Sequence, residues 1–518
     1  MADQTQRHVN PWIVAVAVMF GTFMEVLDTT VVNVSLPHIA GNLSATIDES
    51  TWVLTSYLVA NAIILPLTGW MARFFGRKRL LMASLAGFTT SSLLCGLAPN
   101  LPLLVFFRLV QGATGGAMQP LSQAVMLEAF PPEQRGKAMG FWGLGIVVAP
   151  ILGPVLGGWL TDSYSWRWVF YINLPIGIVS LLMTRAYIFD PPYLKTESSK
   201  VDYWGIGLLA VGIGALQLLL DKGQEEDWFS SHFMTTLAVM SVVALVVFLI
   251  HEWYAEEPVV DLRVFKIRTY STGVFLMTTL GFVLYGSLVL LPILLQTLLG
   301  YPSLQAGIAM APRGMGSFIG MPLIGVLIGR FDPRKMVAFG LFVGGLTLLW
   351  LGQINLHAGY WDFFWPQFVQ GFALSMLFVP LTTISMDPIP RERMGNATSL
   401  FNLMRNIGGS IGIATTGTML ARQQQAQINV LGAHVSALDP ATQTMFASMR
   451  AGFIASGADA YTATQRAYGS LFGMVQQQAA IVSFVSIFRL LGIIFLLLIP
   501  LTLLMRRPGA KGGPVAAH

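Results

Sequence analysis

Long apolar stretches recur through the whole sequence and limit what the chain can fold into. A helix that crosses a membrane needs about 20 mainly apolar residues, and glycine, proline and charged breaks separate fourteen such stretches. They lie near residues 12–36, 51–72, 80–98, 101–125, 136–160, 166–188, 204–220, 233–253, 270–297, 305–329, 335–354, 363–386, 396–420 and 481–505. Because only 11% of the residues are charged, the chain could not cover a water-facing surface. We predict an all-α membrane protein with fourteen transmembrane helices.

Basic residues alternate between the two sides of these spans. Of the 30 Lys and Arg residues, 21 fall in connections on one side, five fall on the other, and four lie inside spans. Short loops rich in Lys and Arg stay in the cytoplasm, so both termini are predicted to be cytoplasmic and the number of spans to be even. The net charge of +5 is therefore interpreted as a topology signal and not as a nucleic-acid-binding surface.

Three motifs occur twice, in the same order, at offsets of 256 to 259 residues. The pairs are GWMARFFGRKRL (69–80) with GVLIGRFDPRKM (325–336), FFRLVQG (106–112) with WPQFVQG (365–371), and PPEQRG (131–136) with PRERMG (390–395). Both copies keep one orientation, and two parallel six-helix halves are the architecture of major facilitator transporters. Here the offset covers eight spans instead of six. Spans 7 and 8 are therefore predicted to be inserted between the halves, and substrate is expected between the halves near mid-membrane.

The repeat and the topology together divide the chain into five parts. We expect a cytoplasmic N-terminus (1–11), an N-terminal six-helix bundle (12–190), the inserted helices 7 and 8 (191–260), a C-terminal six-helix bundle (261–505) and a cytoplasmic tail (506–518). The second bundle contains the one long connection, 421–480, which is predicted to be periplasmic and to form amphipathic helical pieces.

Four motifs carry a family resemblance. They are LDTTVVNVSLP (27–37) in the first span, Leu104, Arg108, Gln111 and Gly112 in the fourth, Gly153, Pro154, Gly157 and Gly158 in the fifth, and Gly69, Ala72, Gly76, Arg77 and Lys78 after the second. From about residue 14 to 507 the sequence resembles the fourteen-span drug:proton antiporters of the major facilitator superfamily. Within them it is similar to the EmrB-type inner-membrane subunits of tripartite multidrug efflux pumps. The loop motif usually has an aspartate where this sequence has Arg73.

The resemblance implies what the chain transports, what drives it and what it binds. It implies export of hydrophobic or amphipathic drugs across the bacterial inner membrane, driven by the proton motive force, with no cofactor and no metal. It also implies a periplasmic membrane-fusion adaptor and an outer-membrane channel. The 421–480 connection is interpreted as a docking surface for that adaptor, or alternatively as a helical flap over the outer vestibule. Conformational gating is assigned to Gly69, Gly76, Arg77, Lys78, Gly153, Pro154, Gly157 and Gly158.

Two other functions were weighed against this one. Export of a specific metabolite, such as a fatty acid or a siderophore, is the alternative on the same fold. An enzyme is not expected, because the sequence has no GxxxxGK[ST] motif and its seven histidines are scattered, whereas a metal centre needs clustered ligands.

Charged residues inside the predicted spans are candidates for proton coupling. A charge in the membrane interior is costly, and is by default a functional hypothesis. Glu25 and Asp28 share one face of the first span. Asp28 lies about 12 Å from the outer end of that span and Arg108 about 10 Å from the outer end of the fourth, at 1.5 Å per residue. We expect these three to form a proton switch; the alternative is a static pair holding the first span against the fourth.

The second half has no such acid. The position that matches Arg108 is Gln367, and the ninth span near Val283, which matches the first, has no carboxylate. Proton handling is therefore assigned to the first half alone. Arg489 is interpreted as structural. Candidate substrate-binding residues are Asn33, Tyr57, Asn61, Gln111, Tyr285, Gln296, Arg313, Asn402 and Arg405.

Overall fold

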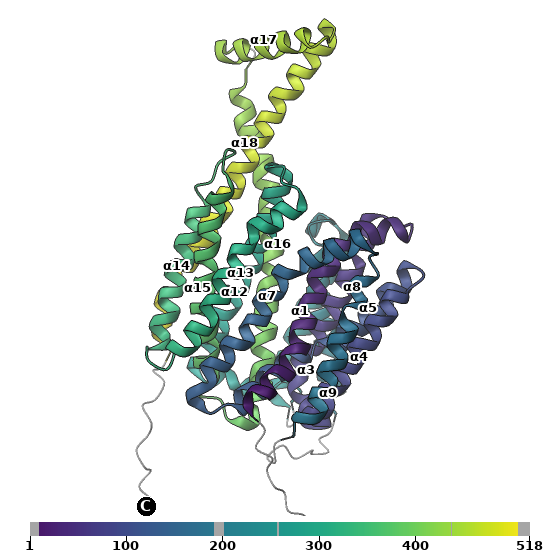
Figure 1. The fold of residues 1–518 in the computed structure, drawn as a ribbon, viewed down its shortest axis with the longest axis vertical. Coiled ribbons are helices and arrows are strands. Elements are labelled where there is room, and N and C mark those ends of the chain that lie inside the picture. The colour runs from purple at the N-terminus through teal and green to yellow at the C-terminus, as the bar shows by residue number, and fades with distance from the viewer. Residues whose placement is uncertain (1–9, 191–200, 256–257, 437, 506–518) are drawn as a thin grey trace, which may run out of the picture.

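The computed structural model describes residues 10–190, 201–255, 258–436 and 438–505 (Figure 1). Most of the expected cytoplasmic N-terminus, the expected tail and the linker 191–200 lie outside these residues. So do the basic residues Arg7, Lys195, Lys200, Arg506, Arg507 and Lys511 of the topology argument. Everything described is helix, turn or loop, as the sequence predicted.

Within the described residues, the first half is built from nine helices. They are α1 (Pro11–Asn42), α2 (Ile47–Ser50), α3 (Trp52–Phe75), α4 (Arg77–Leu97), α5 (Leu101–Gly115), α6 (Met118–Ala129), α7 (Arg135–Ser163), α8 (Trp168–Tyr171) and α9 (Asn173–Tyr187), where α2 is a single turn before α3. The inserted pair follows as α10 (Tyr203–Lys222) and α11 (His232–Tyr254).

The second half has a similar order of helices, but its helices α16 and α18 are longer. Its helices are α12 (Arg268–Ile293), α13 (Ser303–Leu327), α14 (Pro333–Leu351), α15 (Tyr360–Met386), α16 (Met394–His434), α17 (Pro440–Ala455) and α18 (Ala460–Leu497). A single π-helical turn, Leu294–Leu298, continues α12.

Hydropathy supports most of the predicted spans. In the described part of the chain, eleven helical segments are long and apolar enough to cross a membrane, or twelve if α7, which bends by 41°, is counted as one span. Pro150 and Pro154 lie inside α7, and proline frees a carbonyl and bends a helix. Helices α13 and α16 do not reach this threshold, yet both pack inside the bundle. The all-helical prediction is confirmed, whereas the count of fourteen stays a prediction.

The two halves use the same helix contacts. In the first half α1 packs on α7 and α3 on α5, and in the second α12 packs on α16 and α13 on α15. A Cβ atom added at Gly112 would lie 2.2 Å from the carbonyl oxygen of Tyr57, and one at Gly371 would lie 1.9 Å from that of Arg313. These two contacts occupy matching positions of the sequence repeat.

The inserted helices touch both halves. Helix α10 packs on α11, on α3 and on α16. The Thr55 hydroxyl of α3 donates to Asp221 of α10, and Ser410 of α16 donates to Gln217 at 3.1 Å. The insertion therefore lies along the seam between α3 and α16.

The 421–480 connection forms an arm. The C-terminal part of α16 and the N-terminal part of α18 project beyond the bundle, and α17 lies across their ends (Figure 1). Asp439 and Asp459 cap α17 and α18, accepting from the Thr442 amide at 2.9 Å and the Tyr461 amide at 3.0 Å. Side-chain hydrogen bonds from Thr442 and Thr462 lower the pKa of these two carboxyls. Helix α17 has no buried residue.

Glycines of α7 differ sharply in the space around them. A Cβ atom at Gly153 would lie 2.0 Å from Thr30 Oγ1 of α1, whereas one at Gly158 would meet nothing within 4 Å. We expect Gly153→Ala to destabilise the protein by about 1–3 kcal/mol through overpacking of α1 on α7. Gly158→Ala, on the same helix, is the matched control and should be neutral in thermal unfolding of the purified protein. Equal melting temperatures for the two variants would contradict this contact.

Candidate functional site

The centre of the first half holds a fully buried ion pair. Arg108 Nη1 of α5 lies 2.5 Å from Asp28 Oδ2 of α1, and neither side chain is exposed. The depths estimated from the sequence allowed this contact, and the structure contains it. Arg108 is also held in place by donating from Nε to the Val53 carbonyl at 3.0 Å, and its guanidinium stacks 4.2 Å above the Tyr57 ring.

Two amides complete the coordination of Asp28. Gln111 Nε2 donates to Asp28 Oδ1 at 3.1 Å and Asn173 Nδ2 of α9 donates to the same oxygen at 2.7 Å. Gln111 in turn accepts from Arg108 at 2.7 Å. Every hydrogen-bonding neighbour of this carboxylate is a donor, so the arrangement suits the ionised form of Asp28.

Asn173 was missed at the sequence level. It begins α9, inside the apolar run FYINLPIG (170–177). A single amide side chain in such an apolar run could have identified Asn173 as a candidate, because buried polar groups are hydrogen-bonded. Its partner could not be read from spacing, because Asp28 is 145 residues away.

Glu25 has a different environment from Asp28, although both lie on α1. Asn61 Nδ2 of α3 donates to Glu25 Oε1 at 2.9 Å. Within the described residues the other oxygen, Oε2, has no hydrogen-bond partner. Arg405 of α16 acts on Glu25 electrostatically. Glu25 is therefore influenced by a cation of the second half, whereas Asp28 is neutralised inside the first.

A set of side-chain bonds joins α6 of the first half to α16 of the second. Arg405 Nη2 donates to Gln119 Oε1 at 2.6 Å, and Asn402 Nδ2 donates to Gln123 Oε1 at 2.5 Å. Nearer the start of α16, the Thr398 hydroxyl donates to the Pro120 carbonyl at 3.2 Å. These bonds hold the halves together between mid-helix and the basic end of the bundle.

Close backbone contacts continue this closure to the end that carries the basic loops. A Cβ atom added at Gly69 of α3 would lie 2.7 Å from Asn396 Cα, and one at Gly325 of α13 would lie 3.1 Å from Lys137 Cα of α7. These two contacts are again equivalent under the sequence repeat. Only glycine allows helices to approach so closely, so the described conformation is closed at this end.

The gating residues of the loop motif lie at the same end. Gly76 has a φ of 87°, which favours glycine. Arg77 pairs with Glu128 of α6, and the Lys78 amide donates to Asp190 Oδ1 at 2.8 Å. These contacts tie the start of α4 to α6 and to the end of the first bundle.

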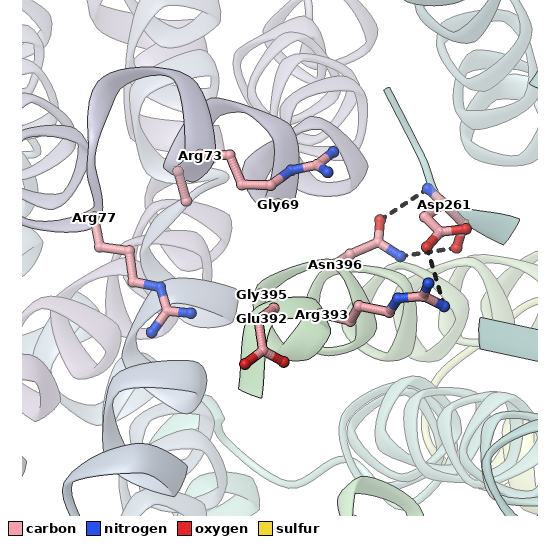
Figure 2. Close-up of a pocket in the computed structure, with 9 residues that line it drawn as sticks. Gly69, Arg73, Arg77, Asp261, Glu392, Arg393, Gly395 and Asn396 are labelled. Carbon is pink, nitrogen blue, oxygen red and sulfur yellow. Dashed lines mark hydrogen bonds and ion pairs between the residues drawn. The ribbon is translucent and has the colours of Figure 1, made fainter. Parts of the chain in front are cut away.

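An aspartate from elsewhere in the chain lines the same pocket as Arg73. Figure 2 shows the pocket that Gly69, Arg73 and Arg77 share with the start of α16. Asp261, which follows the inserted helices, lies 3.6 Å from Arg393, and its backbone exchanges hydrogen bonds of 3.2 and 2.9 Å with the Asn396 side chain. The linker after α11 thus brings an acid to the same pocket as Arg73, where that acid pairs with Arg393.

The remaining predicted residues are spread more widely. Gly153 and Gly157 pack against α1, Pro154 lies inside α7, and Gly158 is open. Tyr285 of α12 packs against Gly409. Arg313 is buried in α13 and donates to Ser287 of α12 at 3.2 Å. Asn33 and Gln296 are exposed, Asn33 on α1 and Gln296 in the π-helical turn, apart from the buried clusters.

The sequence is similar to one protein family and to several named proteins. Residues 18–413 match the sequence model of the Major Facilitator Superfamily. The chain is 38% identical to the Multidrug export protein EmrB of Escherichia coli (strain K12) over 510 residues, covering 98% of each chain. It is also 38% identical to the Fatty acid resistance protein FarB of Neisseria gonorrhoeae, covering 96% of this chain and 97% of that one.

A solved structure gives the same fold. The human organic anion transporter MFSD10 superposes with a TM-score of 0.60 at 14% identity, covering 95% of this chain and all of that one. At this identity the likeness concerns the fold alone.

The ion pair can be tested by a double-mutant cycle. Removing one partner of a buried pair leaves an uncompensated charge, so we expect Arg108→Gln to cost about 3–5 kcal/mol of unfolding free energy. Introducing Asp28→Asn into the Arg108→Gln variant should then lower the free energy of unfolding much less than Asp28→Asn lowers it in the wild type. The measurement is denaturant unfolding of the purified protein in detergent. Arg167→Gln is the control, since Arg167 donates to the Gly96 and Ala98 carbonyls and not to Asp28. The decreases in unfolding free energy caused by Arg167→Gln and Asp28→Asn should therefore be additive. Strict additivity for Arg108 would contradict the coupling.

Proposed function

The chain belongs to the major facilitator superfamily, and we propose that it is a proton-driven antiporter that exports hydrophobic and amphipathic compounds, drugs among them, by alternating access. Members of this superfamily are multi-pass membrane transporters and not enzymes. The observation that carries the proposal is the buried Asp28–Arg108 pair in the first half. A membrane protein that buries a titratable carboxylate beside a cation has the parts of a proton relay.

Protonation of Asp28 would disturb its whole surroundings. A proton on either oxygen removes the attraction to Arg108 and faces an N–H donor, from Arg108 at Oδ2 or from Gln111 and Asn173 at Oδ1. At least one donor must then move, and the donors belong to α5 and α9. Helix α1 packs on α7, which in turn packs on α13 of the second half. This chain of contacts offers a route from proton uptake to the seam between the halves.

The hydrogen bonds between the two halves identify contacts that must break when the basic end opens. To open the basic end, the Arg405–Gln119 and Asn402–Gln123 bonds must break, together with the contact of Gly69 on Asn396. Glu25 acts electrostatically on Arg405, so protonating Glu25 would weaken one link across the seam. Proton binding and opening would share residues, which is the coupling an antiporter requires.

Export of a specific metabolite is the second candidate. It is favoured by the relative named Fatty acid resistance protein FarB, which is as similar in identity as the E. coli multidrug export protein. Uptake into inverted vesicles, across a panel of drugs and fatty acids with and without an uncoupler, would separate a narrow substrate range from a broad one.

We also propose a bacterial inner-membrane location with the basic end in the cytoplasm and the arm in the periplasm. The excess of Lys and Arg in the loops at that end supports this orientation. The arm exposes Leu438, Tyr461, Tyr468 and Phe472, and exposed apolar side chains of this kind mark interaction sites. Since α17 extends away from the bundle (Figure 1), docking of a periplasmic adaptor, with an outer-membrane channel beyond it, is favoured over a flap.

The decisive variant for proton coupling is Asp28→Asn. It keeps the shape of the side chain but cannot exchange a proton, so uncoupler-sensitive export from vesicles should fall to the level of empty vesicles while expression is unchanged. Asp162→Asn, an exposed aspartate on α7, is the matched control and should export normally. Wild-type export by Asp28→Asn would remove Asp28 from the mechanism.

The arm can be separated from transport by deletion. Replacing residues 427–465 with a short Gly-Ser linker should abolish pull-down of a membrane-fusion adaptor from the same organism, while transport in vesicles persists. Loss of transport together with adaptor binding would instead favour the flap. Retained adaptor binding would show that the docking surface lies elsewhere.

A further inference from the structure

The second half contains a counterpart of the ion-pair site from which the acid is missing. The matching glycine contacts place Arg313 where Tyr57 stands in the first half. By the repeat of FFRLVQG and WPQFVQG, Gln367 stands in place of Arg108 and Gln370 in place of Gln111. The repeat offsets of 256 to 259 residues carry the position of Asp28 to residues 284–287 of α12, which contain no acid and end at buried Ser287.

Arg313 is therefore a buried cation without a counter-charge. Its one side-chain hydrogen bond within the described residues goes to the Ser287 hydroxyl at 3.2 Å, and Nε has no partner. No acid of the described residues acts on it electrostatically. The acids Asp332, Asp362, Asp387 and Glu392 of this half all lie at helix ends. Buried charges are normally paired, so this one calls for a partner from outside the chain.

Two amide side chains in the same counterpart site also have a buried oxygen without a hydrogen-bond partner among the described residues. Gln367 Oε1 and Gln370 Oε1 have no hydrogen-bond partner in the described part of the chain, and both side chains are buried. Side-chain amides can present either their N–H groups or their oxygen after a flip. The first half uses the residues at these two positions, Arg108 and Gln111, to donate to a carboxylate.

We infer that Arg313, Gln367, Gln370 and Ser287 bind a monovalent anionic group, which takes the place that the Asp28 carboxylate has in the first half. Two sources share this chemistry: the carboxylate of an amphipathic substrate, which rests on the proposed function, and free chloride. All four side chains are buried in the described conformation, so the anion enters in another state of the transport cycle. Occupancy by an anion thereby favours one state over the other.

The test compares an acid with its uncharged analogue. Binding of decanoate and decanamide to the full-length protein in lipid nanodiscs is measured in chloride-free gluconate buffer. A charge-assisted pair with arginine should make decanoate bind about tenfold more tightly than the amide. Arg313→Gln should abolish this preference. Ser287→Asp should abolish it too, because it supplies Arg313 with a carboxylate from within the chain.

A matched control keeps the result specific. Arg489 of the same half donates to the Gly352 carbonyl at 2.8 Å, and Arg489→Gln should retain the preference for decanoate. If Arg313→Gln fails to fold, Ser287→Asp, which keeps the arginine, carries the test alone.

The outcomes distinguish the two anions and the two proposals. Loss of the preference in both variants supports a substrate carboxylate. If decanoate shows no preference, but replacing gluconate by chloride raises the melting temperature of the wild type and not of Arg313→Gln, the occupant is free chloride. If neither anion separates wild type from the variants, the inference is wrong. Export by wild-type proteoliposomes is measured in parallel; insensitivity to an uncoupler would overturn the proton-driven function and leave the anion-binding result intact.

Discussion

A carboxylate and a guanidinium buried together in a membrane protein dictate the arrangement of the first half. Asp28 and Arg108 are held together inside α1 and α5 by Gln111, Asn173 and the Val53 carbonyl, which bond to Asp28 Oδ1 and Arg108 Nε, while Arg108 Nη2 has no hydrogen-bond partner within the described residues. Four helices, α1, α3, α5 and α9, must therefore keep one relative position while Asp28 is ionised. The second half keeps the backbone contacts of this site and replaces the charged pair, so the two halves share a shape and differ in chemistry.

Much of this arrangement could be predicted from the sequence, because it depends on properties local to each helix. Apolar length predicted helices, the repeat predicted an insertion between the halves, and depth along the spans allowed Asp28 to meet Arg108. Contacts that depend on how each helix is rotated could not be predicted. The contact of Asn173 with Asp28, the influence of Arg405 on Glu25, and the ion pair of Asp261 with Arg393 all join segments far apart in the chain. Helices α13 and α16 fell below the hydropathy threshold of a span; they carry the buried Arg313 and Arg405.

The insertion is more than a spacer between two bundles. Helix α10 contacts α3 and α16, one from each half, and the linker after α11 brings Asp261 to the start of α16. The inserted segment thus contacts the seam between the halves at two places, along α10 and at the basic end. A closed basic end in this chain involves three parts of the molecule, namely the two halves and the segment between them.

The continuity of α16 links events at opposite ends of the protein. It is one helix of 41 residues, Met394–His434, or about 60 Å at 1.5 Å per residue. Its first turns form the closed gate, its first third bears Arg405, and its last turns form one side of the arm. A rigid rod that pivots near its middle moves its two tips in opposite directions. Opening the gate would therefore swing the arm, so a protein seated on the arm would sense each transport cycle mechanically, and could resist it.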